Sequence, residues 1–130
     1  LEFVKNPKNN NLINPLAQNL ISNKKIGIIS HLDVSSFLNY HNSKIIVKLS
    51  IPKRDAGVFN KMTYKKFNII KQSIMNVKED VDIWYLGAGA YAKPFSNYIK
   101  QNNGIAIDIG SAIDTWVGEY HSRKYLRELV

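Results

Sequence analysis

Four apolar runs of strand length recur along the chain, separated by segments with helix or turn signals. The runs are KIGIISH at residues 25–31, KIIVKLS at 44–50, DIWYLG at 82–87 and GIAIDIG at 104–110. Runs that are largely apolar, instead of alternating every second residue, are typical of parallel strands covered by helices on both faces. The sequence therefore predicts a three-layer, Rossmann-like α/β fold with a mainly parallel sheet of about four strands and right-handed crossovers.

The first helix signal follows the N-terminal segment. Asn14 can cap a helix whose first position is Pro15, because that position needs no backbone N–H donor. Leu16, Leu20 and Ile21 follow at helical spacing. We expect these three side chains to form the buried face of a short helix.

Further helix signals occur between the later runs. Asp33 can cap a short helix, and Thr63 can cap a longer one. The longer helix should bury the side chains that recur at helical spacing, which are Phe67, Ile70, Ile74 and Val77. Ser111 and Asp114 fit a capping box. The segment 51–62 has proline, glycine and charges without a period, so it predicts a loop.

The length of 130 residues fits one folded domain. Residues 1–12 are polar and rich in asparagine, which predicts a flexible arm, followed by a single domain over 13–130. The chain has no cysteine, no apolar run of about 18 residues and no apolar signal-peptide core, so we expect neither a disulfide framework nor a membrane span. A cytoplasmic location fits this composition.

The formal net charge of +8 raises the question of nucleic-acid binding. Three of the 18 basic residues are arginine and the rest are lysines scattered along the chain. Arginine is the preferred side chain for reading base edges and forked phosphate contacts. We therefore expect a solvated basic surface and no specific nucleic-acid partner.

A glycine-containing turn follows the third predicted strand. Residues 87–92 read G-A-G-A-Y-A, which fits G-x-G-x-x-A, and an aspartate closes the next strand. Such a turn lets backbone amides approach a phosphate, and a lysine can add charge. The candidate ligand-binding residues here are Gly87, Gly89, Ala90, Tyr91 and Lys93. The alternative is that the glycines only bring a helix close to the strand.

A second group of candidates should share the same edge of the sheet, because ligands of such sheets bind outside the carboxyl ends of the strands. The candidates are Asp108, Gly110, Ser111, Asp114 and His31. The Asp108 carboxylate can accept two sugar hydroxyls, or it can cap the amides of Gly110 and Ser111, or pair with Arg123. Ser111 and Asp114 can equally be a helix cap, and a lone His31 can be a general base or structural. No catalytic residue and no metal ligand is assigned; Asp80 and Asp82 precede a strand and belong to the opposite edge.

Residues 86–123 carry a resemblance to known proteins. The stretch from LGAGAYAKPF through GIAIDIGSAIDTWVGEYHSR is similar to a segment near the C-terminus of bacterial polysaccharide-biosynthesis proteins. It resembles, more distantly, the closing strand-helix-strand of glycosyltransferases of the GT-D fold. KKIGIISHLDVSSFL and KLSIPKRDAG resemble the same proteins more loosely, so the similarity covers about residues 24–123.

The resemblance implies a domain that binds a nucleotide-sugar or a related diphosphate in polysaccharide biosynthesis. The residues of this chain that match the family's motif are Gly87, Gly89, Asp108, Gly110, Ser111, Asp114, Trp116 and Arg123. The GT-D family has an acidic metal-binding motif upstream of this segment, whereas residues 1–23 contain no aspartate. The chain is then either a fragment or a relative without transferase activity, and whether it is an enzyme stays open.

Two other function classes stay open as well. One is the dinucleotide-binding domain of an oxidoreductase, which would normally place its glycine turn after the first strand of the sheet. The other is an interaction module without catalysis, which needs only the fold. The sequence does not identify a cofactor or an oligomeric state.

Overall fold

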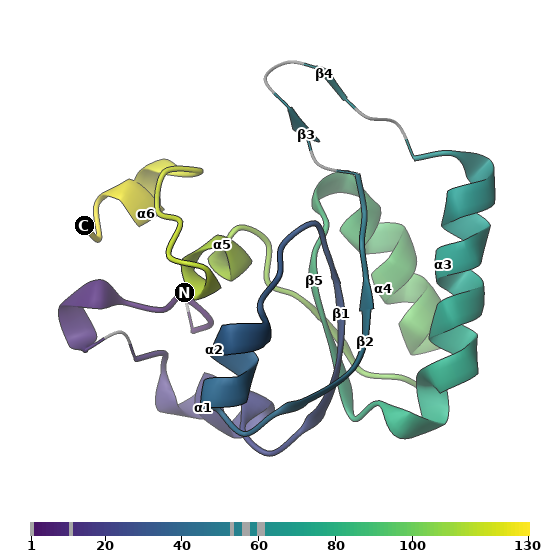
Figure 1. Ribbon diagram of the computed structural model, residues 1–130, viewed down its shortest axis with the longest axis horizontal. Helices are drawn as coiled ribbons and strands as arrows, with labels where there is room; N and C mark the ends of the chain where they lie inside the picture. Colours follow the sequence, from purple (N-terminus) through teal and green to yellow (C-terminus); the bar gives the residue numbers. More distant parts are fainter. Residues whose placement is uncertain (1, 11, 53, 56–57, 60–61) are drawn as a thin grey trace.

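A computed structural model describes residues 2–10, 12–52, 54–55, 58–59 and 62–130. A four-stranded, all-parallel sheet forms its centre (Figure 1). In the order β2-β1-β5-β6, the strands are β2 (Lys44–Leu49), β1 (Lys25–Ser30), β5 (Ile83–Gly87) and β6 (Ala106–Asp108). This confirms the predicted α/β fold and its four strands, although β6 is shorter than expected.

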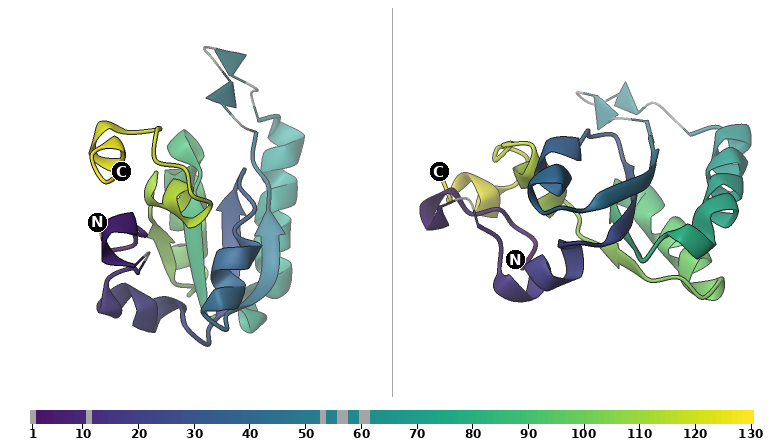
Figure 2. Two further views of the ribbon diagram at one scale, coloured as in Figure 1. Left: turned by 60° about the vertical axis from the view of Figure 1, so that its left-hand side comes forward. Right: turned by 60° about the horizontal axis from the view of Figure 1, so that its bottom comes forward.

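Helices cover both faces of this sheet (Figures 1 and 2). One face carries α1 (Pro15–Ile21), α2 (Ser35–Tyr40) and α5 (Ala112–Trp116), with α6 (Lys124–Arg127) beside them. The other face carries α3 (Tyr64–Val77) and α4 (Ala92–Gln101). Short 3₁₀ turns occur at Pro7–Asn9, Lys78–Asp80 and Gly89–Tyr91. The protein is therefore a three-layer, Rossmann-like α/β structure.

Two hydrophobic cores lie on opposite sides of the sheet, since successive side chains of a strand point to opposite faces. Strand β5 supplies Ile83 and Tyr85 to the core under α1, α2 and α5. It supplies Trp84 and Leu86 to the core under α3 and α4. The neighbouring β1 carries Gly27 beside the Trp84 ring, where a Cβ atom would lie 2.4 Å from a ring carbon. The large indole thus fits in the sheet because its neighbour has no side chain.

The structure confirms the predicted start of helix α1 and corrects its predicted buried face. The Asn14 side chain accepts a hydrogen bond from the Leu16 amide at the start of α1, as predicted. The expected apolar face is wrong for two of its three residues, because Leu16 is 72% exposed and Leu20 is 43% exposed. Ile21 is buried as expected, and Ala17 is buried with it. A helix of two turns presents a narrow contact face, and the i, i+4 pair 17 and 21 occupies it.

The later helix predictions have mixed outcomes. Thr63 caps α3 by accepting from the Lys66 amide, and Ile70 and Ile74 are buried, as expected. The Asp33 carboxylate accepts from the Ser35 amide, one residue before the helix N-cap position. The predicted capping box at Ser111 is wrong, because that residue has helical backbone angles and makes no side-chain cap.

The segment 51–62 is not a plain loop. It contains a short antiparallel pair, β3 (Arg54–Asp55) and β4 (Val58–Phe59). The pair extends beyond the sheet between β2 and α3 (Figure 1). Since the strands have two residues each, no run of alternating side chains could have indicated them.

The N-terminal segment packs against the C-terminal part of the chain. Val4 is 6% exposed and belongs to the core under α1, α2 and α5. The Trp116 indole Nε1 donates to the Phe3 carbonyl at 2.8 Å, and the Lys5 amide donates to Thr115 Oγ1 at 2.9 Å. The division into a flexible arm and a domain from residue 13 stays a prediction. Nowhere in the described ranges is there a helix both long and apolar enough to cross a membrane.

Candidate functional site

The strand order of the sheet reverses between β1 and β5. From β1 the chain passes outward to β2 and then returns to β5 on the other side of β1. At such a switch point the loops after the two strands diverge and leave a crevice at the carboxyl edge, where ligands of open α/β sheets bind. Ser30 pairs with Gly87 across this boundary, and Leu86 pairs with Asp108 on the next strand. His31, the glycine turn and Asp108 therefore follow neighbouring strand ends at one edge, as predicted.

The turn after β5 has an open, left-handed glycine. Gly89 has φ of +55°, and a Cβ atom at that position would meet nothing within 4 Å. The amide of Tyr91 donates to Ala88 O, and the amide of Ala92 donates to Gly89 O. The amides of Gly89 and Ala90 have no acceptor among the described residues. The turn thus presents two exposed backbone donors just before α4.

The other glycine of the turn has a packing role. A Cβ atom on Gly87 would lie 2.4 Å from Ile113 Cγ2. Ile113 is buried in α5, so the bare backbone of Gly87 lets that helix approach the strand end. The packing interpretation therefore applies to Gly87, which accommodates α5, whereas the space beside Gly89 is open.

Asp108 ends β6 in an exposed position. Its Oδ1 accepts a hydrogen bond from the Gly110 amide at 3.0 Å, and Gly110 has φ of +54°. This is the predicted capping of Gly110, formed within a local turn. Within the described residues, neither Ser111 nor Arg123 donates to the carboxylate. Oδ2 has no donor there either, so the carboxylate keeps an acceptor atom toward solvent.

The other predicted residues spread over several roles. The Ser111 hydroxyl lies 2.8 Å from the Tyr125 hydroxyl, and Tyr91 Oη accepts from the Met62 amide at 3.1 Å. Lys93 and His31 are exposed.

Asp114 and Trp116, the two remaining residues of the resemblance, differ in their surroundings. The Asp114 carbonyl accepts from the amides of Val117 and Glu119, which ends α5. Trp116 is 3% exposed in the core. The carboxyl edge therefore carries the backbone amides of Gly89 and Ala90 and the Asp108 carboxylate as open polar groups. Asp33, after β1, adds a second carboxylate. Hydrogen bonds from the Ser35 hydroxyl and amide lower the pKa of Asp33.

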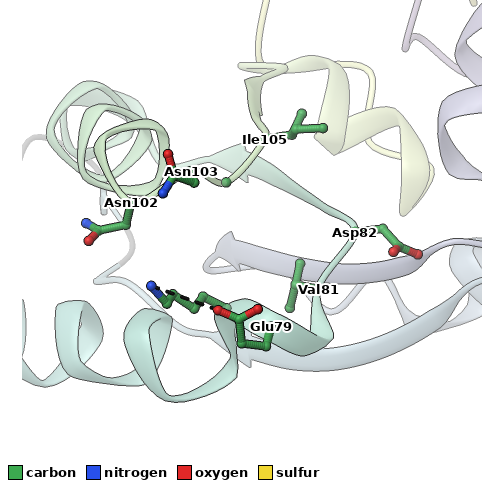
Figure 3. Close-up of a pocket in the computed structure, with 8 residues that line it drawn as sticks. Glu79, Val81, Asp82, Asn102, Asn103 and Ile105 are labelled. Carbon is green, nitrogen blue, oxygen red and sulfur yellow. Dashed lines mark ion pairs between the residues drawn. The ribbon is translucent and has the colours of Figure 1, made fainter.

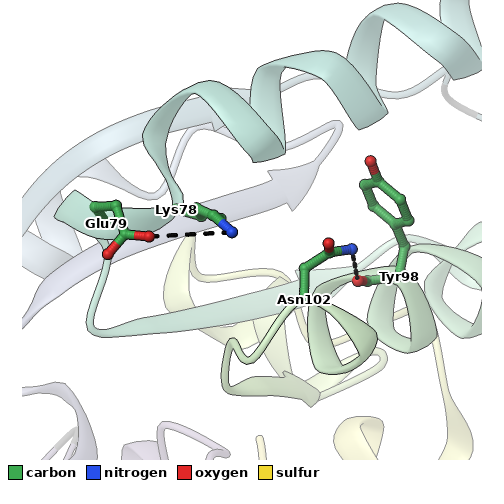
Figure 4. A network of polar contacts seen from close by, with 4 residues as sticks. All are labelled: Lys78, Glu79, Tyr98 and Asn102. Carbon is green, nitrogen blue, oxygen red and sulfur yellow. Dashed lines mark hydrogen bonds and ion pairs between the residues drawn. The ribbon is translucent and has the colours of Figure 1, made fainter.

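A small cavity of about 190 Å³ lies at the opposite, amino edge of the sheet (Figure 3). Asp82 lines it, and its Oδ2 accepts from the Lys25 amide at 2.8 Å, which ties the start of β5 to β1. Lys78 Nζ lies 4.0 Å from Glu79 Oε1, and Asn102 Nδ2 donates to the Tyr98 carbonyl (Figure 4). The Lys78–Glu79 and Asn102–Tyr98 contacts are local ones at the ends of α3 and α4. In the described part of the chain, no three His, Cys, Asp or Glu side chains are grouped as a metal site would need.

A larger cavity of about 400 Å³ lies beside α2, on the face that α1, α2 and α5 cover. We call it the α2 cavity, and its lining residues are Lys5, Asn10, Ser36, Phe37, Tyr40, His41 and Trp116. Sequence reasoning missed it, because the lining comes from segments more than 100 residues apart. The one local signal is the i, i+4 pair Phe37 and His41, whose ring centroids are 4.6 Å apart.

Comparison with known proteins gives no identification: neither family models, nor curated proteins, nor solved structures match this chain. The fold class, an α/β domain with a four-stranded parallel sheet, is therefore what is established.

Proposed function

We propose that the carboxyl edge of the sheet binds the diphosphate and sugar of a nucleotide-sugar, as the resemblance to polysaccharide-biosynthesis proteins implies. The observation that carries the proposal is the turn at Gly89, where a left-handed glycine with open space precedes a helix at the switch point. An anion placed there would accept from the amides of Gly89 and Ala90 and interact favourably with the N-terminal end of α4.

Charge and hydroxyl recognition would come from neighbouring residues. Lys93 is exposed in the first turn of α4 and can add a positive charge near the phosphates. Asp108 can accept a ribose or sugar hydroxyl through Oδ2 while Oδ1 stays bonded to Gly110. His31 follows β1 on the other side of the switch point. These side chains support binding, and no catalytic role is assigned to any of them.

The geometry also favours a second candidate, a dinucleotide. In dinucleotide-binding folds the glycine turn and the ribose-binding acid belong to adjacent parallel strands joined by a helix. Strand β5, helix α4 and strand β6 form such a unit, with Asp108 at the end of the neighbouring strand. The unit comes after two other strands of the sheet, however, which is unusual for that class.

A thermal-unfolding series with nucleotide-sugars and NAD separates these candidates. A ligand at about 100 times its dissociation constant stabilises the fold by roughly 2.7 kcal/mol, which is a melting shift of several degrees for a domain of this size. We expect UDP-sugars, with or without manganese, to give this shift and NAD and NADP to give none. A shift with NAD alone would favour the dinucleotide, and no shift with any of them would favour an interaction module.

Asp108→Asn tests the site itself. The amide oxygen of asparagine can still accept from the Gly110 amide, so the local turn should persist while the charged acceptor is lost. We expect this variant to lose most of the ligand-induced shift and to keep its melting temperature without ligand. The matched control is Asp80→Asn, the same change in the exposed turn at the opposite edge. Equal responses of both variants would remove Asp108 from the site.

A further inference from the structure

The α2 cavity combines a large volume with an aromatic floor. Its volume of about 400 Å³ is within the range of small-molecule sites. Phe37 and Trp116 stack in its floor with ring centroids 4.3 Å apart and an angle of 18° between the ring planes. Tyr40 lines the cavity while 76% exposed, and its ring lies edge-on to His41 at 5.2 Å. The exposed Tyr40 ring is thus the surface most open to a planar ligand, and the stacked Phe37 and Trp116 pair forms an apolar wall beside it.

The charges around the cavity have one sign. Lys5 is a cation in the lining, and none of the lining residues is an aspartate or a glutamate. His41 is half-buried, and both this burial and the nearby Lys5 charge lower its pKa, so the imidazole is mostly neutral at pH 7. Ser36 and Asn10 add a hydroxyl and an amide that can hydrogen-bond to a ligand. Lys5 is thus the one charged side chain among these lining residues, and its charge favours an anionic ligand over a cationic one.

Lys5 is held in position by its backbone. Its amide donates to Thr115 Oγ1 at 2.9 Å, and its carbonyl accepts from the Tyr120 hydroxyl. Phe3, two residues earlier, accepts from the Trp116 indole. The ammonium group is thus carried by a segment that is fixed to α5 and to the turn that follows it, next to the aromatic floor.

We propose that the α2 cavity binds a small planar aromatic acid, whose ring packs against the exposed Tyr40 ring beside the stacked Phe37 and Trp116 pair and whose carboxylate pairs with Lys5. This site differs from the carboxyl-edge site, because none of its lining residues is among the candidates at that edge. The order of affinity follows from the lining: an aromatic carboxylate binds more tightly than its uncharged amide, and an aromatic amine binds most weakly.

The test uses the ¹⁵N-labelled 130-residue chain with indole-3-carboxylate, indole-3-carboxamide and tryptamine as probes. At up to about 10 mM ligand, in the affinity range of small fragments, we expect saturable shifts of the Trp116 indole and the amides of Ser36 and His41. The carboxylate should bind at least about tenfold more tightly than the carboxamide, because a charge-assisted contact is lost in the latter.

Two lysine variants locate the charge. Lys5→Met keeps both backbone hydrogen bonds of that residue, so the cavity should persist and the carboxylate should bind no better than the carboxamide. Lys8→Met removes the same charge from the same segment outside the lining, where Nζ contacts the Glu128 carbonyl, and it should leave the tenfold preference intact. The proposal would be overturned if the unchanged chain bound the carboxylate and the carboxamide equally well. It would also be overturned if both lysine variants lost the preference for the carboxylate to the same extent, or if no saturable shifts occurred at Trp116.

Discussion

The two faces of the sheet are covered by different means. On one face, α3 and α4 have 14 and 10 residues, and their packing is largely apolar. On the other face, α1, α2 and α5 have only five to seven residues each. Helices that short are marginal by themselves, so they depend on tertiary contacts, which include the apolar core beneath them.

Hydrogen bonds between distant segments add to the apolar core on this face. The Tyr85 hydroxyl donates to the Leu20 carbonyl, and the buried Ser43 hydroxyl donates to the Ile21 carbonyl, so both tie down the end of α1. Trp116 and Tyr120 donate to the N-terminal segment in the same way. One side of this sheet is thus covered by longer helices with apolar faces, and the other side by short helices that hydrogen bonds connect to distant segments.

The largest expected effect is on the α3/α4 face. Phe95 is fully buried and stacks on Phe67 with ring centroids 4.7 Å apart. Phe95→Ala should lower the free energy of unfolding by about 3–5 kcal/mol, since it removes apolar contacts and leaves a cavity. Urea denaturation measures this loss. Phe37→Ala on the opposite face should lower the free energy of unfolding by an amount at the lower end of that range, because Phe37 already borders a cavity. A larger loss for Phe37→Ala than for Phe95→Ala would contradict this difference between the two faces.

A smaller effect is expected from a single cross-link. Tyr120→Phe removes the hydroxyl that donates to the Lys5 carbonyl and should cost about 0.5–1.5 kcal/mol. The matched control is Tyr98→Phe in α4, since the Tyr98 hydroxyl has no hydrogen-bond partner among the described residues. We expect the control to change the free energy of unfolding by a few tenths of a kcal/mol at most. Similar losses in both variants would show that the cross-link contributes nothing.

The smallest expected effect is a pH dependence on the cross-linked face. Burial lowers the pKa of His41 below its ordinary value of 6.5, and the Lys5 charge lowers it further. The unfolded chain therefore binds more protons than the folded chain below about pH 6.5, so stability should fall as the pH drops from 7 toward 5.5. His41→Gln should flatten this decrease in urea titrations. Asp33 has a lowered pKa too, but it titrates below this window.

The sequence predicted the sheet well because its central strands, β1 and β5, are buried on both faces. The runs that contain Ile28, Trp84 and Ile107 are apolar enough to be recognised without any neighbour. Helix α3 was predictable for a related reason: 14 residues give a clear period, and Thr63 marks its start. Long elements with one buried face carry their signal within a single window of sequence.

The predictions failed where distant contacts decide the local structure. Ser111 has the sequence of a helix cap, yet its hydroxyl contacts Tyr125, which is 14 residues away. Leu16 is more apolar than Ala17, yet Ala17 faces the core. At the candidate site, the positions of Gly89 and Asp108 were predictable from strand ends. The contact of Gly87 with Ile113 was not, because it depends on where α5 packs.

The joining of residue 5 to residue 115 also affects the order in which the chain folds. The β5-α4-β6 unit spans residues 83–108 and closes a short loop, whereas the bond from the Lys5 amide to Thr115 Oγ1 bridges 110 residues. Because closing longer loops costs more entropy, we expect the N-terminal segment to dock after the folding transition state. Thr115→Val should then speed unfolding and leave the folding rate unchanged in stopped-flow measurements. The α2 cavity would thus be the last part of the molecule to form and the first to open.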